Sequence, residues 1–186
     1  MPVYRKLLPA ERHRYPGHLL RLDRNDRHAR FTGTISDSVI ERHCERLDWG
    51  LTTVVGCFHQ GELRGAVELC TDRLIWPNQA ELAISVEGTL QGQGVGTALV
   101  RRALTIARNR RIERVHMLCL PDNRRMRALA RRFGGTMEVD GGEVTIAIAL
   151  PPPNQFSIAL EAMEDGAGAV GAVLDQWQRA GAVRAA

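Results

Sequence analysis

The chain has 186 residues, of which 44% are hydrophobic and 25% are charged. This length suits one ordinary domain with its own core, and the composition is that of a folded globular protein and not of a disordered one. No stretch approaches the roughly 20 apolar residues that span a membrane. Arg12, His13 and Arg14 also interrupt any signal-peptide core. We therefore expect a cytoplasmic protein with no membrane partner.

The first half of the chain is predicted to be a strand, helices and then a run of strands. Residues 3–8 form the first strand, the segment up to residue 50 is helical, and a second helix begins at Ser36-Asp37. Segments 51–58 and 63–69 are β-rich and flank a turn, which predicts a hairpin. After a turn at Trp76-Pro77-Asn78, residues 80–86 alternate apolar and polar side chains as a strand does.

In the second half of the chain, the spacing of apolar residues changes from strand-like to helical at a group of glycines. Apolar residues recur at helical spacing over residues 95–106. Residues 112–120 are almost continuously apolar and predict a central strand that is buried on both faces. Asp122 or Asn123 caps an amphipathic helix that ends at Gly134-Gly135, and a hairpin over 136–150 closes the domain.

The run Pro151-Pro152-Pro153 predicts a boundary between a domain over residues 1–150 and a tail over residues 151–186. The tail is rich in proline, alanine and glycine, and its apolar residues predict two short helices separated by Gly166 and Gly168. Three roles stay open for the tail. It caps the domain, it pairs with a second subunit in a homodimer, or it frays.

Cysteine and histidine spacing predicts no metal site and no disulfide framework. Cys44, Cys57, Cys70 and Cys119 are scattered and form no CxxC pair, and the histidines lack ligand spacing. We therefore expect free, buried thiols.

The positive charge is carried by arginine. The net charge is +4, Lys6 is the only lysine, and arginines crowd the stretch from Arg101 to Arg132. Such an excess suits either a nucleic acid or a phosphate-rich small ligand. Aromatic residues make up only 5% of the chain and no nucleic-acid motif is present, so we expect no nucleic-acid partner. Either the arginines lie on solvated helix faces or a subset of them faces an anionic cofactor.

Between a predicted strand and a predicted helix lies the turn Gln91-Gly92-Gln93-Gly94-Val95-Gly96-Thr97. The first N–H groups of a helix have no intrahelical partner, the helix dipole makes that end electropositive, and glycines let an anion approach. This pattern favours a pyrophosphate site over a merely tight loop. The dinucleotide fingerprint GxGxxG fails because Thr97 stands at its third glycine, and the P-loop fails because Gly-Lys-Ser/Thr is missing.

The pattern that remains, Gln-x-x-Gly-x-Gly, resembles the acyl-CoA pyrophosphate turn of the GNAT superfamily of N-acetyltransferases. The resemblance runs from Val54 to Leu150, and Asn123, Met126 and Leu129 match the family's helix beside the pantetheine arm. Segments 80–96 and 35–43 look especially like the catalytic domain of bacterial protein-lysine acetyltransferases.

The resemblance implies an α/β (α+β) fold. Its central sheet is mixed and mostly antiparallel, with about seven strands flanked by helices, and it splays after the fourth strand to hold CoA. The implied reaction transfers acetyl from acetyl-CoA to a primary amine, either a protein lysine or a small molecule, by direct attack in a ternary complex. The alternative is a non-catalytic acyl-CoA-binding sensor or interaction module. The implied cofactor-binding residues are Ile84, Ser85, Val86, Gln91, Gly92, Gln93, Gly94, Val95, Gly96, Thr97, Asn123 and Met126.

Amine acetylation needs a general base, because a lysine amine with a pKa of about 10.4 is protonated at neutral pH. The resemblance points to Glu81, with Glu68 and Glu87 as rival bases. A backbone N–H near Ser85 or Val86 is expected to polarise the thioester carbonyl.

The general acid is open. The place where many family members carry a tyrosine is occupied by Ala130, and Tyr4 and Tyr15 are distant in sequence. Cys119, Ser85, a water molecule or no dedicated acid at all are the remaining alternatives.

Overall fold

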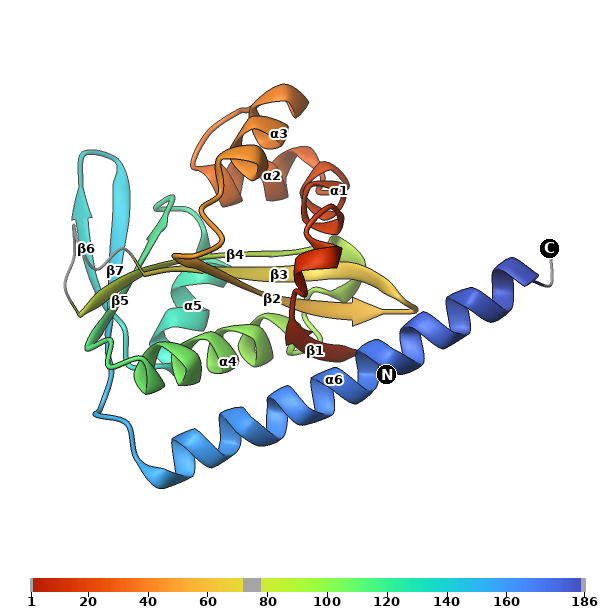
Figure 1. Ribbon diagram of the computed structural model, residues 1–186. Coiled ribbons are helices and arrows are strands. Elements are labelled where there is room, and N and C mark those ends of the chain that lie inside the picture. The colour runs from red at the N-terminus through yellow and green to blue at the C-terminus, as the bar shows by residue number, and fades with distance from the viewer. Residues whose placement is uncertain (1, 72–77, 185–186) are drawn as a thin grey trace.

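The protein is built around one mixed seven-stranded sheet (Figure 1). The computed structural model describes residues 2–71 and 78–184, so Trp76 and Pro77 of the predicted turn lie outside the described residues. The strand order is β1-β2-β3-β4-β5-β7-β6, and only β4 and β5 run parallel. The predicted fold class is therefore confirmed. The strands are β1 Val3–Lys6, β2 Thr52–His59, β3 Glu62–Cys70, β4 Gln79–Val86, β5 Arg114–Cys119, β6 Thr136–Asp140 and β7 Glu143–Ala149.

Helices cover both faces of the sheet (Figure 1). On one face lie α1 Arg14–Leu20, α2 Arg24–Phe31 and α3 Asp37–Arg46, and on the other lie α4 Val95–Asn109, α5 Arg124–Arg132 and α6 Gln155–Arg184. The helical N-terminal segment contains a break that we did not predict. Asp23 caps α2 by accepting a hydrogen bond from the Asp26 N–H at 2.7 Å, and this starts a new helix after α1.

Alternation along the strands divides the apolar residues between two cores. In β2 and β3, Val55 and Val67 belong to the core beneath α4 and α5, whereas Val54 and Ala66 belong to the core beneath α1 and α3. Because successive side chains of a strand point to opposite faces, each strand contributes to both cores. The sheet is thus held rigidly from both sides, and its central strands can position a site.

The parallel pair β4 and β5 separates soon after it begins. Only Gln79–Glu81 pair with Arg114–His116, and the later residues of both strands have no partner across this gap. The splay explains why the prediction for β5 was wrong in one respect. Val115, Met117 and Cys119 are buried, but Leu118 is 45% exposed, because no strand or helix covers that side once β4 has turned away.

The tail forms one long helix, α6, and not the two short helices that we predicted. The helix crosses β1 and α4 (Figure 1). A Cβ atom on Gly168 would lie 2.7 Å from the Arg5 Cβ, and one on Gly171 would lie 2.8 Å from the Val3 Cγ1. These glycines therefore allow close packing on β1 and do not break the helix. No helix within the described ranges combines the length and the apolar character needed to cross a bilayer.

Candidate active site

The glycine-rich turn opens α4 at the splayed end of the sheet. Gly92 and Gly94 have φ values of 72° and 81°, in the left-handed region that side chains rarely adopt. Gly94 is the N-cap, and the first intrahelical bond runs from the Ala98 N–H to its carbonyl at 3.0 Å. The N–H groups of the first helical turn are therefore left for an external acceptor, as an anion site requires.

The side chain of Gln91 ties this turn to three neighbouring elements. Its Nε2 donates to Asp26 Oδ2 and to the Val86 carbonyl, both at 2.8 Å. Its Oε1 accepts a hydrogen bond from Arg125 of α5. Gln91 thus links α2, the end of β4 and α5 around the glycines, and the turn is held in one place.

A groove of about 1010 Å³ runs from this turn into the splay between β4 and β5. It is lined by most of the residues that the resemblance implied: Ile84, Ser85, Val86, Gln91, Gly92, Gly94, Gly96, Thr97, Asn123 and Met126. Two are not among the lining residues. Gln93 bonds the Thr89 carbonyl through its side chain, and the Val95 side chain lies in the core beneath α4.

The far wall of the groove is the beginning of α5. Asn123 caps this helix, and its side-chain oxygen accepts from the Met126 N–H at 3.0 Å. Met126 and Leu129 line the groove together with Ile84 of β4. Apolar side chains therefore line the groove beside the polar turn.

Several arginines line the groove. Arg124, Arg125 and Arg132 of α5 line it, together with Arg30 of α2. The other arginines of the basic stretch include Arg102, which ion-pairs with Glu164 of α6 at 2.9 Å, and Arg108, which donates to the Pro152 carbonyl. Part of the stretch therefore faces the groove, and part of it anchors the tail.

Glu81 lies exposed on β4, where that strand separates from β5. At Arg30, burial lowers the pKa, but Tyr15, Glu68 and, to a smaller extent, the Glu81 charge raise it above its ordinary value. At His116, burial and the charge of Arg114 lower the pKa, and the Glu81 charge opposes this without cancelling it. Among the described residues no hydrogen bond or ion pair holds the Glu81 carboxylate. His116 itself bonds Gln79 at 2.7 Å.

The two rival carboxylates are occupied by other groups. Glu68 Oε2 accepts from Tyr15 Oη at 2.7 Å and from Arg30 Nη2 at 2.9 Å, and it lies 3.1 Å from His43 Nε2. Burial alone would raise the pKa of Glu68, but the bonds from His43, Arg30 and Tyr15 outweigh this and hold the pKa below its ordinary value. A carboxylate stabilised in this way is a weak base.

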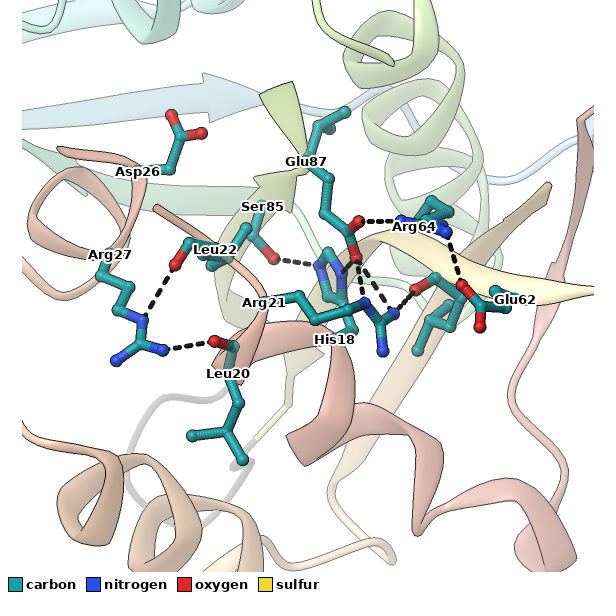
Figure 2. A network of polar contacts seen from close by, with 12 residues as sticks. His18, Leu20, Arg21, Leu22, Asp26, Arg27, Glu62, Arg64, Ser85 and Glu87 are labelled. Atoms are coloured by element: carbon teal, nitrogen blue, oxygen red, sulfur yellow. Dashed lines mark hydrogen bonds and ion pairs between the residues drawn. The ribbon is translucent and has the colours of Figure 1, made fainter. Parts of the chain in front are cut away.

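Glu87 takes part in a second network, which Figure 2 shows at close range. Its carboxylate accepts from Arg21 Nε at 3.0 Å and from Arg64 Nη1 at 2.8 Å, and Oε1 lies 3.0 Å from His18 Nδ1. His18 Nε2 lies 2.9 Å from Ser85 Oγ. Sequence reasoning missed His18, because it carries no motif and only the packing of α1 on the sheet brings it to Ser85.

Most of the side chains considered for the general acid lie away from the groove. Ala130 is buried in the core beneath α5, and Cys119 is buried there as well, where desolvation raises the pKa of its thiol. Tyr15 is buried against Glu68. Of the residues considered, Ser85 alone lines the groove. The residues that the structure describes contain no cluster of three potential metal ligands.

Comparison with known proteins agrees with this geometry. The model of the acetyltransferase (GNAT) family matches residues 18–135. The GNAT domain of S. lividans PAT has a TM-score of 0.68 at 22% identity, with 79% of this chain and 89% of that chain covered. A GNAT-family acetyltransferase from Streptococcus pneumoniae has a TM-score of 0.63 at 15% identity, with 81% and 100% covered.

A third similar structure contains the coenzyme. The PaiA N-acetyltransferase from Thermoplasma acidophilum, in complex with coenzyme A, has a TM-score of 0.60 at 18% identity, with 80% of this chain and 99% of that chain covered. At these identities the likeness is one of fold. The family match spans more than half of the sequence, and the chain therefore belongs to the GNAT family and is an acyl-CoA-dependent acetyltransferase.

Proposed function

We propose that the protein transfers acetyl from acetyl-CoA to a primary amine, of a protein lysine or of a small molecule, by direct attack in a ternary complex. The observation that carries this proposal is the groove, whose lining combines an anion-accepting turn, arginines and apolar side chains. The pyrophosphate would lie on the N–H groups after Gly94, and the pantetheine arm between β4 and α5, with Asn123 and Met126 beside it. This order of polar and apolar surface fits acetyl-CoA.

Glu81 is the proposed general base. It is exposed at the splay, and unlike Glu68 and Glu87 it has no hydrogen-bonding partner among the described residues. An ammonium acceptor that enters beside β4 would lose its first proton to this carboxylate, directly or through water. Backbone N–H groups near Ser85 and Val86 would stabilise the oxyanion that forms on the thioester.

A thiol-release assay with acetyl-CoA tests this function on lysine peptides and a panel of small amines. Removing a general base typically costs about 10²- to 10⁴-fold in rate, so we expect Glu81→Gln to lose that much kcat. Glu45→Gln, an exposed glutamate on α3, is the matched control and should keep full activity. CoA binding without turnover on any amine would contradict the proposal and favour a sensor, and full activity of Glu81→Gln would remove Glu81 as the base.

We also propose that residues 151–186 are a dimerisation element appended to the catalytic domain of residues 1–150. Exposed apolar and small side chains recur on α6 at alternating steps of four and three residues, the heptad pattern of a coiled coil. They are Phe156, Leu160, Met163, Ala167, Val170, Leu174 and Trp177. A neighbouring side of α6 packs on the domain through Ser157, Glu161 and Gly168. A second copy would present the same seam and cover this one.

Sedimentation equilibrium tests the dimer. Val170→Asp places a charge on the seam and should yield monomers, whereas Ala169→Asp, one residue away and also exposed, should leave the dimer intact. A monomeric native protein at micromolar concentration would contradict this proposal and leave the enzymatic one untouched.

A further inference from the structure

A chain of two hydrogen bonds joins the groove to a buried carboxylate. Ser85 Oγ lies 2.9 Å from His18 Nε2, and His18 Nδ1 lies 3.0 Å from Glu87 Oε1 (Figure 2). His18 is fully buried, and Ser85 and Glu87 are only 7% and 6% exposed. Ser85 is the one member of the three that lines the groove. The chain is therefore shielded from solvent along its length and reaches the groove at Ser85.

The charges around the chain decide where its protons are. Burial would raise the pKa of Glu87, but the bonds from His18 and Arg64 and the charge of Arg21 outweigh it and lower the pKa, so Glu87 is an anion that can only accept. His18 Nδ1 must then carry a proton. Burial also lowers the pKa of His18, and the charges of Arg21 and Arg30 add to this, while Glu87 opposes it without cancelling it. His18 is therefore neutral, with its proton on Nδ1.

A neutral His18 protonated on Nδ1 leaves Nε2 without a proton. Nε2 must then accept the hydrogen bond, and the Ser85 hydroxyl must donate it. The lone pairs of Ser85 Oγ are consequently free to accept a further hydrogen bond. If Oγ accepts a proton, its own proton can pass to Nε2, and the imidazolium formed is stabilised by the adjacent Glu87 anion.

We infer that Ser85 is a catalytic residue that carries the second proton of the transfer, while His18 takes up and returns the Ser85 proton and Glu87 orients His18. This inference rests on the proposed function. Acetylation of an ammonium releases two protons from nitrogen. The first goes to Glu81 and then to solvent. The second leaves the nitrogen only after attack, and the sulfur of CoA needs one proton when it departs.

The relay moves the proton that the nitrogen loses to the sulfur that needs it. The neutral amine forms the N–C bond to the thioester carbon, and its second proton passes to Ser85 Oγ while the Ser85 proton passes to His18 Nε2. The C–S bond then breaks, and the sulfur keeps the electron pair. His18 Nε2 returns its proton to Ser85, and Ser85 protonates the sulfur. No other reactant is consumed, and the chain ends in its starting state.

The relay also accounts for the missing tyrosine. Ala130 has no proton to give, and Cys119 lies in the core and not in the groove. A side chain that both accepts from the amine and donates to the sulfur performs the tasks of a base and an acid in turn, so no second hydroxyl on α5 is required.

Kinetics of Ser85 variants with the best amine test the relay. A positioned acid or base contributes about 10²- to 10⁴-fold, so Ser85→Ala should lose that much kcat while the KM for acetyl-CoA stays within about threefold. Ser85→Thr keeps the hydroxyl and should recover most of the activity. Thermal unfolding and CoA affinity, measured on both variants, show whether either one is misfolded.

Nitrogen-15 NMR of His18 gives a readout that does not depend on turnover. We expect the neutral Nδ1–H tautomer at pH 7. A proton on Nε2 would reverse the hydrogen bond to Ser85 and overturn the relay even in an active enzyme. Full kcat in Ser85→Ala, or an equal loss in Ser85→Thr, would overturn the relay and leave the transferase intact. A wild-type protein that binds CoA but acetylates no amine would overturn the proposed function, and the relay with it.

Discussion

Two glycines of α6, two residues apart, should respond in opposite ways to the same substitution. Gly166→Ala adds a methyl group that meets nothing within 4 Å, whereas the methyl of Gly168→Ala would lie 2.7 Å from the Arg5 Cβ. In both positions alanine favours a helix over glycine by about 1 kcal/mol. At Gly168 this gain is offset by overpacking, which costs about 1–3 kcal/mol, because carbon atoms in contact need about 3.5 Å or more.

Gly166→Ala should therefore stabilise the protein by about 1 kcal/mol, whereas Gly168→Ala should be neutral or destabilise it by up to about 2 kcal/mol. In a domain of this size 1 kcal/mol shifts the Tm by about 2–4 °C. Urea denaturation followed by circular dichroism measures the difference, and hydrogen exchange of the α6 amides shows whether the helix itself has loosened. Equal stabilisation by both substitutions would refute the packing of α6 on β1.

At the start of α5, Asn123→Ala removes the bond to the Met126 N–H and should cost about 1 kcal/mol in thermal unfolding, whereas Asn123→Asp should cost little. In the turn, Gly94→Ala forces a side chain to φ 81°. It should cost about 1–2 kcal/mol and weaken acetyl-CoA binding, and an unchanged Kd by calorimetry would contradict this. Burial on its own would raise the pKa of Glu11, but the bonds from Arg5 and Arg14 outweigh burial and lower the pKa from 4.5 to about 2. The folded protein gains stability from this lowered pKa above pH 4.5 and loses it as the pH falls towards 2. The urea midpoint of Glu11→Gln should therefore fall less steeply between pH 4.5 and pH 2 than that of the wild-type protein.

Local patterns in the sequence predicted the elements well where the structure is decided locally. The alternation over residues 80–86 and the helical period after Gly94 correspond to β4 and α4. The predictions were wrong where a residue distant in sequence determines the local structure or the burial. Gly168 was interpreted as a helix breaker, because nothing in the sequence shows that β1 lies against it. Leu118 was placed in a buried strand, because a splay between neighbouring strands leaves no mark on the strand itself.

The same distinction holds for the candidate site. The glycine turn and Asn123 form contiguous motifs, so the groove could be outlined from the sequence. The partners of Ser85 could not be predicted. His18 and Glu87 are 69 residues apart and meet only because α1 lies across the end of β4. The sequence shows that serine, histidine and glutamate residues are present. Without the fold, many other combinations of these three residue types could equally form a hydrogen-bonded chain.

The helices over this face of the sheet also determine which carboxylate is free to act. Glu68, Glu81 and Glu87 lie on or next to the central strands β3 and β4, and any one of them could serve as a base by residue type. The helices α1, α2 and α3, together with the residue that follows α1, supply the groups that bond to Glu68 and Glu87. These are Tyr15, His18, Arg21, Arg30 and His43. Each bond stabilises the anion and lowers its basicity. Glu81 lies beyond these bonds, and this supports our proposal that Glu81, and not Glu68 or Glu87, takes a proton from the incoming amine.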